Sequence, residues 1–196
     1  ETEMAQPAHQ PQTFDDVETL EDRDGLRYEL WNGAPVAMTG GTPQHNLIAL
    51  GLRDVIKPQL DPSCRVFVAD VGLRLGEAQR SNKAYPDVMV VCNPQSQTYQ
   101  SKAALVAEVL SDNSVSRDRN TKFRAYTEHD AVQNYLILSQ SAVEIEVYRR
   151  TTGWAEEVYR GPQAVVELRH PALRLPLRQI YAEVWEEVAQ SDWRKK

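Results

Sequence analysis

The sequence lacks any apolar run long enough for a membrane-spanning helix. Such a helix needs about 20 predominantly apolar residues, and no stretch of the 196 residues supplies them. The first twelve residues are polar and contain proline, without the basic flank and apolar stretch of a secretory signal. We therefore expect a cytoplasmic protein with no membrane partner.

Cysteine is scarce as well. The two cysteines, Cys64 and Cys92, each lie at an end of an apolar segment, and neither has a second cysteine or a histidine at the spacing of a metal site. Since thiols stay reduced in most cytosolic proteins, we expect two free cysteines.

Positive charge is not in excess. Lysine and arginine number 22 against 28 aspartates and glutamates, which gives a formal net charge of −6. Because non-specific affinity for nucleic acids comes mostly from cations that meet phosphates, a nucleic-acid site in this chain must carry its positive charge locally. The sequence also contains no zinc finger and no helix-turn-helix motif that would read bases.

The length is that of one ordinary domain. The hydrophobic fraction of 41% and the charged fraction of 26% are those of globular proteins and not of disordered ones. We expect residues 1–12 to form a flexible N-terminal segment, residues 13–190 a single domain, and residues 191–196 a tail.

Hydrophobic periodicity and turn signals predict alternating helices and strands. Helices are expected over residues 13–21, 44–60, 117–129 and 176–189. Strands are expected over residues 26–31, 35–38, 65–75, 85–92, 105–110, 134–138, 143–149, 154–159 and 165–168.

Three details of this pattern define the predicted fold. Asn32 and Gly33 supply the positive φ of a β-hairpin, and an irregularity is expected near Asp70. Residues 85–92 and 105–110 are apolar on both faces, which is typical of central strands covered on both sides. The pattern predicts a mixed α/β sheet flanked by helices, with an N-terminal β-hairpin and a C-terminal helix.

An acidic residue interrupts one of the predicted central strands. Glu108 stands within Ala-Leu-Val-Ala-Glu-Val-Leu, where a buried carboxylate costs free energy unless a cation or hydrogen bonds compensate it. The neighbouring apolar strand begins with Pro86-Asp87, so pairing of the two strands would bring both acids to one end of the sheet. Converging carboxylates are suited to Mg²⁺, which prefers oxygen ligands.

Lys122 follows Glu108 by 14 residues. This spacing allows the intervening loop to turn the chain back, so that the next helix presents an ammonium group beside the acids. In such a cluster a metal ion polarises the phosphoryl oxygen, and the lysine orients the nucleophile or neutralises developing charge.

These residues also carry a family resemblance. The sequence resembles the Uma family, whose members are assigned as endonucleases within the PD-(D/E)-x-K nuclease superfamily. The resemblance spans residues 14–148 and rests on the following residues: Tyr28-Glu-Leu, His45, Tyr85-Pro-Asp87, Glu108-Val-Leu-Ser111, Asp118 and Lys122. It implies a restriction-endonuclease-like core.

The resemblance also implies roles for individual residues. Asp87 and Glu108 would bind the metal, Mg²⁺ or Mn²⁺, with Glu29 as a further acid and His45 as a polar partner. The superfamily lysine normally lies two residues after the second acid, but Leu110 occupies that position here, and Lys122 is implied as the relocated substitute.

The strand that follows the third predicted helix departs from the family pattern. The family usually shows a Glu-Tyr-Trp run and then an aspartate, whereas this chain has Asn134-Tyr135-Leu136 and Ser139.

Each candidate has a structural alternative. Asp118 and Lys122, four residues apart, can form an exposed helical ion pair, and Glu108 can be a buried acid satisfied by arginine or backbone amides. Asp87 can serve a turn, His45 can pack or cap a helix, and Glu29 can face solvent.

We expect a metal-dependent endonuclease that hydrolyses phosphodiester bonds in DNA. Two alternatives stay open: a catalytically silent binding or regulatory module with a nuclease fold, and a hydrolase of small phosphodiesters. The apolar stripe near Trp185 is suited to the core or to a homodimer contact.

Overall fold

A computed structural model describes residues 13–38, 40–76, 81–95, 99–110 and 116–189, with the backbone alone for residues 116–118 and 189. Within these residues no helix is long and apolar enough to cross a membrane. The chain divides into two compact units, an N-terminal unit of residues 1–39 and 74–84 and a main unit of residues 40–73 and 85–196.

The N-terminal unit contains a helix and a small sheet. Helix α1 (Phe14–Asp24) begins with a capping box between Thr13 and Asp16. Strands β1 (Tyr28–Trp31) and β2 (Ala34–Ala37) form the predicted hairpin, and Asn32 and Gly33 have φ values of 52° and 81° at its turn. The sheet continues from β1 to β5 (Asn82–Ala84), a strand that we did not predict.

A buried lysine explains why β5 is hard to recognise. Lys83 is only 2% exposed, its ammonium donates to Glu21 over 2.7 Å, and it lies 5.0 Å from the centre of the Phe14 ring. A short segment that contains a charged residue looks like an exposed loop in the sequence. Here the segment is a buried strand, because an ion pair within the unit compensates the charge of Lys83.

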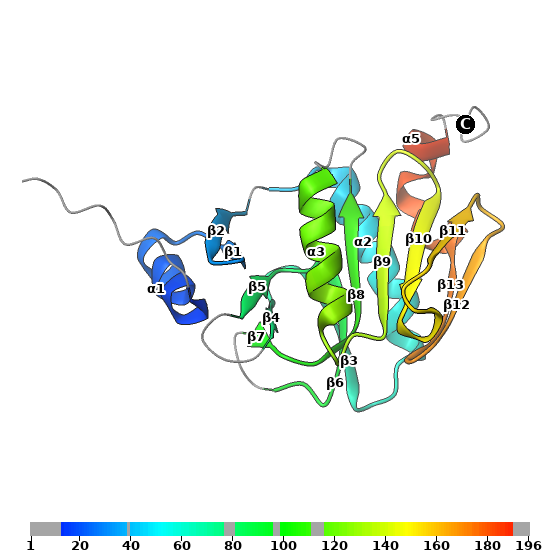
Figure 1. The fold of residues 1–196 in the computed structure, drawn as a ribbon. Coiled ribbons are helices and arrows are strands. Elements are labelled where there is room, and N and C mark those ends of the chain that lie inside the picture. The colour runs from blue at the N-terminus through cyan, green and yellow to red at the C-terminus, as the bar shows by residue number, and fades with distance from the viewer. Residues whose placement is uncertain (1–12, 39, 77–80, 96–98, 111–115, 190–196) are drawn as a thin grey trace, which may run out of the picture. The chain divides into compact units, whose positions relative to one another are not determined.

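The main unit contains a six-stranded sheet between two helices (Figure 1). The strand order is β11-β10-β9-β8-β6-β3, in which β8 and β9 are parallel and the other neighbours antiparallel. The strands are β3 (Cys64–Val68), β6 (Val88–Cys92), β8 (Ala103–Leu110), β9 (Asn134–Ser139), β10 (Glu144–Arg149) and β11 (Glu156–Arg160).

Helices α2 (Pro43–Ile56) and α3 (Ser116–Glu128) lie on opposite faces of this sheet (Figure 1). The α2 face holds the main core, in which Ile48, Leu52 and Ile56 pack with alternate residues of the strands. The sequence also predicts a serine cap for α3, at Ser114 or Ser116. Ser114 and the side chains of Ser116 and Asp118 lie outside the described residues.

Two predicted elements are broken in the structure. The strand expected over residues 65–75 is split into β3 and β4 (Gly72–Leu75) at Ala69 and Asp70, whose φ values of 42° and 53° end the extended conformation. The expected irregularity near Asp70 is therefore present, but the prediction of a single long strand is wrong. The first two residues of β4 pair in parallel with β7 (Tyr99–Gln100).

The prediction of one continuous helix over residues 176–189 is also wrong. This segment is divided into α4 (Leu177–Ile180), a 3₁₀ turn (Ala182–Val184) and α5 (Trp185–Ala189). The break occurs at Tyr181, whose hydroxyl donates to the backbone oxygens of Ser139 and Glu144. Two further 3₁₀ turns cover Lys57–Gln59 and Arg150–Thr152.

The strand expected over residues 165–168 lies outside the six-stranded sheet. Strand β12 (Val165–Arg169) forms a separate antiparallel pair with β13 (Ala172–Pro176), which was not predicted. Val166, Leu168 and Leu175 are buried in the main core.

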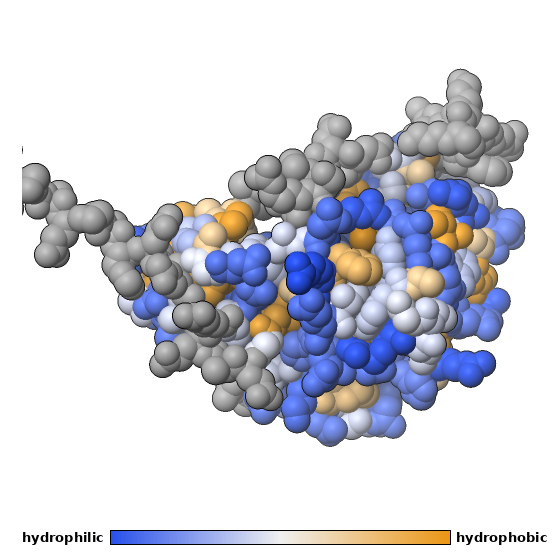
Figure 2. All heavy atoms as spheres, in the orientation of Figure 1, coloured by the Kyte–Doolittle hydropathy of each residue, from blue (hydrophilic) through white to orange (hydrophobic). Residues whose placement is uncertain are grey.

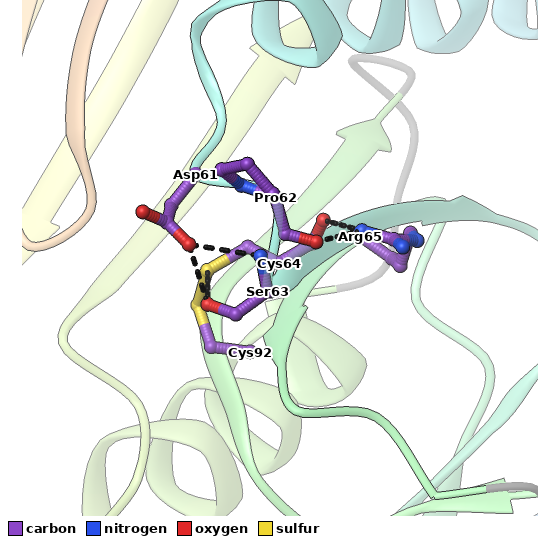
Figure 3. Close-up of a disulfide and its surroundings, with 6 residues drawn as sticks. All are labelled: Asp61, Pro62, Ser63, Cys64, Arg65 and Cys92. Carbon is purple, nitrogen blue, oxygen red and sulfur yellow. Dashed lines mark hydrogen bonds between the residues drawn. A yellow bond between two sulfur atoms is a disulfide. The ribbon is translucent and has the colours of Figure 1, made fainter.

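The two cysteines form a disulfide, so the prediction of free thiols is wrong (Figure 3). Antiparallel pairing of β3 with β6 places Cys64 directly opposite Cys92, although they are 28 positions apart in sequence. The sequence gives the ends of two apolar segments but not their register, and only the register brings the sulfur atoms together. Disulfides are rare in cytosolic proteins, so the pairing does not support the expected cytoplasmic location.

We predict that protein purified without reductant has no reactive thiol. Alkylation of the denatured chain should add no label before reduction and two labels after it, because the structure pairs both cysteines. Intact-mass spectrometry measures the labels directly. Two labels on unreduced protein would contradict the pairing.

Candidate active site

The sheet register brings Asp87 and Glu108 together. In the β6–β8 pair Val88 is opposite Ala107, so continuing the register by one residue places Asp87 opposite Glu108. Opposed residues of an antiparallel pair point to the same face. A hydrogen bond of 2.8 Å from the Val109 backbone N–H to Asp87 Oδ2 joins the two chain segments at this point.

Glu108 lies on the sheet face covered by α3. Its neighbours Ala107 and Val109 belong to the core on the α2 side, and alternation directs Glu108 to the other face. The residue is 3% exposed. The ammonium of Lys122 donates to its Oε1 over 3.2 Å, and the Tyr126 hydroxyl donates to the same oxygen over 2.6 Å.

These contacts bear on the structural alternatives. Lys122 is 19% exposed at its side chain and contacts Glu108, so it is not simply one half of an exposed helical pair. Glu108 accepts hydrogen bonds from a lysine and a tyrosine. The structural alternative for Glu108 required arginine or backbone amides instead.

His45 adds an imidazole to this group. Its Nε2 lies 3.0 Å from Asp87 Oδ2. The residue stands in the first turn of α2, where Thr42 caps the helix by accepting from the His45 backbone N–H. A Cβ at Gly41 would lie 2.9 Å from His45 Nδ1, so a larger residue there would force the ring to shift.

Electrostatics connect all four residues. The pKa of His45 is raised, first because the ring is hydrogen-bonded to Asp87 and further by the charge of Asp87 and then that of Glu108, while burial and the Lys122 ammonium oppose the shift. The structure therefore groups His45, Asp87, Glu108 and Lys122 into one charged cluster, which we call the acid–lysine cluster.

Glu29, the fifth predicted residue, belongs to the N-terminal unit. It is 9% exposed, and its Oε2 accepts a hydrogen bond of 2.9 Å from the indole N–H of Trp31. It therefore does not simply face solvent, and its part in the site stays a prediction.

One contact of the cluster has no strong signal in the sequence. Tyr126, to which the sequence analysis assigns no role in the site, has an exposure of 0%, and its hydroxyl donates to Glu108. The signal available in sequence is its spacing of four residues from Lys122, which puts both side chains on one face of the helix.

The donor atoms of the cluster are compatible with Mg²⁺. In the described part of the chain no group of three or more histidine, cysteine, aspartate or glutamate residues is arranged as a metal site. Mg²⁺ keeps several waters, however, and is commonly bound through one or two carboxylates. Asp87 and Glu108 supply two, and among the described residues Asp87 Oδ1 accepts no hydrogen bond.

Comparison with known proteins supports the fold. A crystal structure of a protein from Anabaena variabilis, described as a "putative nuclease belonging to DUF820", superposes with a TM-score of 0.68 over 88% of this chain and 98% of that one, at 19% identity. This likeness confirms the predicted mixed α/β fold.

Comparison by sequence identifies the family. Two uncharacterized proteins of Synechocystis are similar: one is 33% identical over 134 residues, covering 66% of this chain and 70% of that protein, and the other is 28% identical over 155 residues, covering 75% and 86%. The model of the Uma2 family, described as "Putative restriction endonuclease", matches residues 12–178. This chain therefore belongs to the Uma2 family.

Proposed function

We propose that this protein is a Mg²⁺-dependent endonuclease that hydrolyses phosphodiester bonds in DNA. The observation that carries the proposal is the acid–lysine cluster, in which a buried glutamate bound by a lysine lies opposite an aspartate at the end of a central strand pair. Membership of the Uma2 family supports the reaction class.

Each residue of the cluster has a role in the proposed reaction. Asp87 and Glu108 would hold Mg²⁺ or Mn²⁺, which when bound supplies Lewis-acid polarisation of the scissile phosphate. A water oxygen forms a bond to phosphorus while the ester P–O bond breaks, and the water's proton ends on the leaving oxygen. Lys122 neutralises the negative charge that develops on the phosphoryl oxygens, and His45 orients Asp87.

The positive charge that an acidic protein needs for DNA can come from α3. Arg119 lies on this helix with a side chain that is 38% exposed, and it pairs with Glu146. The surface where α3 lies is predominantly hydrophilic (Figure 2). A partly exposed cation on this helix can contact a phosphate group without reading bases.

We predict that the protein nicks supercoiled plasmid DNA in the presence of Mg²⁺ or Mn²⁺ but not of EDTA. Asp87→Ala should abolish nicking because it removes one of two metal-binding carboxylates. Asp54→Ala is the matched control, since Asp54 is an exposed acid of α2 paired only with Arg53 among the described residues. Gel electrophoresis measures the products, and nicking that survives EDTA or Asp87→Ala would contradict the proposal.

The net charge of −6 favours a second candidate, hydrolysis of a small phosphodiester. The same protein should be assayed with bis(p-nitrophenyl) phosphate and with single-stranded and double-stranded DNA and RNA. Turnover of the small ester alone would select this candidate. Calorimetric binding of Mn²⁺ without turnover of any substrate would instead indicate a silent nuclease-fold module.

A further inference from the structure

Glu108 is held by two donors of different character. Lys122 is partly exposed, with a long flexible side chain, and its ammonium lies 3.2 Å from Glu108 Oε1. Tyr126 is fully buried, and its hydroxyl lies 2.6 Å from the same oxygen. The shorter bond thus comes from the group that water does not reach.

The ring of Tyr126 is itself fixed by its surroundings. It lies on α3 and packs against the ring of Tyr135 of β9, with 5.1 Å between the ring centroids. A tyrosine side chain has only two rotatable bonds before its ring, and full burial against Tyr135 of the sheet leaves the hydroxyl little freedom. Its bond therefore restricts the rotation of the Glu108 carboxylate.

We propose that Tyr126 is a positioning residue that holds the Glu108 carboxylate in the orientation needed to bind the divalent metal ion. The inference rests on the proposed function, since it requires Glu108 to be a metal ligand. Hydrogen bonds to ligating side chains fix the orientation of the ligand, and their loss typically weakens metal affinity by roughly 10-fold to 100-fold. Lys122 supplies charge to the site, and Tyr126 supplies orientation.

The chain offers a matched control for this inference. Tyr135 is as buried as Tyr126 and faces α3 in the same aromatic cluster, but its hydroxyl has no hydrogen-bond partner among the described residues. Tyr126→Phe and Tyr135→Phe each remove one buried oxygen from the same region. Only the first removes a bond to Glu108.

The experiment measures Mn²⁺ affinity directly, by calorimetry or electron paramagnetic resonance, for the wild type and both variants. Tyr126→Phe should weaken Mn²⁺ binding by roughly 10-fold, and Tyr135→Phe should leave the dissociation constant unchanged. In cleavage assays the half-saturating Mg²⁺ concentration of Tyr126→Phe should rise by a similar factor, while its rate at saturating Mg²⁺ stays near that of the wild type. Thermal melts establish that each variant is folded.

The outcomes separate this inference from the proposed function. Wild-type protein that binds no Mn²⁺ would overturn the metal site and the positioning role with it. Binding by the wild type with equal affinity in Tyr126→Phe would overturn the positioning role alone, as would an equal loss in Tyr135→Phe.

A measurement on the wild type covers the case in which Tyr126→Phe does not fold. The ¹³C resonance of the hydroxyl-bearing carbon of Tyr126 should move when Mg²⁺ is added, because the acceptor of its hydrogen bond changes its charge density. A resonance that stays in place at saturating Mg²⁺ would overturn the inference.

Discussion

Replacing Lys122 with methionine should lower the rate of DNA cleavage at saturating Mg²⁺ by about 100-fold or more. Methionine keeps an unbranched side chain of similar length but removes the ammonium that lies 3.2 Å from Glu108 Oε1. Loss of one preorganised group that stabilises transition-state charge typically costs 10²-fold to 10³-fold in kcat. Single-turnover cleavage of plasmid DNA measures this effect without contributions from product release.

The control for this variant is another cation of the same helix. Arg124 is 79% exposed at its side chain and pairs only with Glu128 among the described residues, so Arg124→Met removes the same charge from α3 without touching the acid–lysine cluster. Its cleavage rate should stay within a few-fold of the wild type. Equal losses in the two variants would assign the effect of Lys122 to general electrostatics.

Gly51→Ala should destabilise the main unit by about 3 kcal/mol or more, the upper range for overpacking. In an exposed helix this substitution is stabilising by about 1 kcal/mol, because glycine has the lower helix propensity. Here a Cβ on Gly51 of α2 would lie 2.1 Å from the backbone oxygen of Ile180 in α4. Backbone cannot rotate away as a side chain can, so the two helices must separate.

Chemical denaturation followed by circular dichroism measures the change in unfolding free energy. Gly40→Ala is the comparison, since a Cβ there meets nothing within 4 Å, and it should be neutral or slightly stabilising. A Gly51→Ala protein as stable as the wild type would show that α2 and α4 do not approach as closely as described.

Local patterns were sufficient to predict much of the fold. The hairpin turn at Asn32 and Gly33 depends on a backbone conformation that few residues adopt. The two central strands follow from continuous apolar runs that only a doubly covered strand tolerates. Such features are encoded within a few neighbouring residues and require no knowledge of distant pairing.

The features that escaped prediction depend on tertiary contacts. Cys64 and Cys92 meet only because of one register of two strands. Lys83 is tolerated in a strand because Glu21 and Glu18 pair with it. The C-terminal helix breaks at Tyr181, whose hydroxyl finds acceptors on two distant backbone segments. No local pattern contains this information.

The residues of the candidate site also divide into those that a local pattern predicts and those that only tertiary contacts reveal. Glu108 was recognisable because a carboxylate is unusual in an apolar strand, and Asp87 because the neighbouring apolar run begins beside it. Tyr126 was not recognisable, because tyrosine is common on the buried side of a helix. Only its contact with Glu108 distinguishes it.

The disulfide also helps to determine the sheet face to which the Asp87 side chain points. A strand that slips by one residue turns each of its side chains to the opposite face of the sheet. The edge strand β3 is locked to β6 covalently at Cys92, and beyond the other end of β6 the Ala69 backbone N–H donates to the Asp87 backbone oxygen over 3.2 Å. The disulfide at one end of β6 and this hydrogen bond at the other end thus prevent β3 and β6 from sliding past each other.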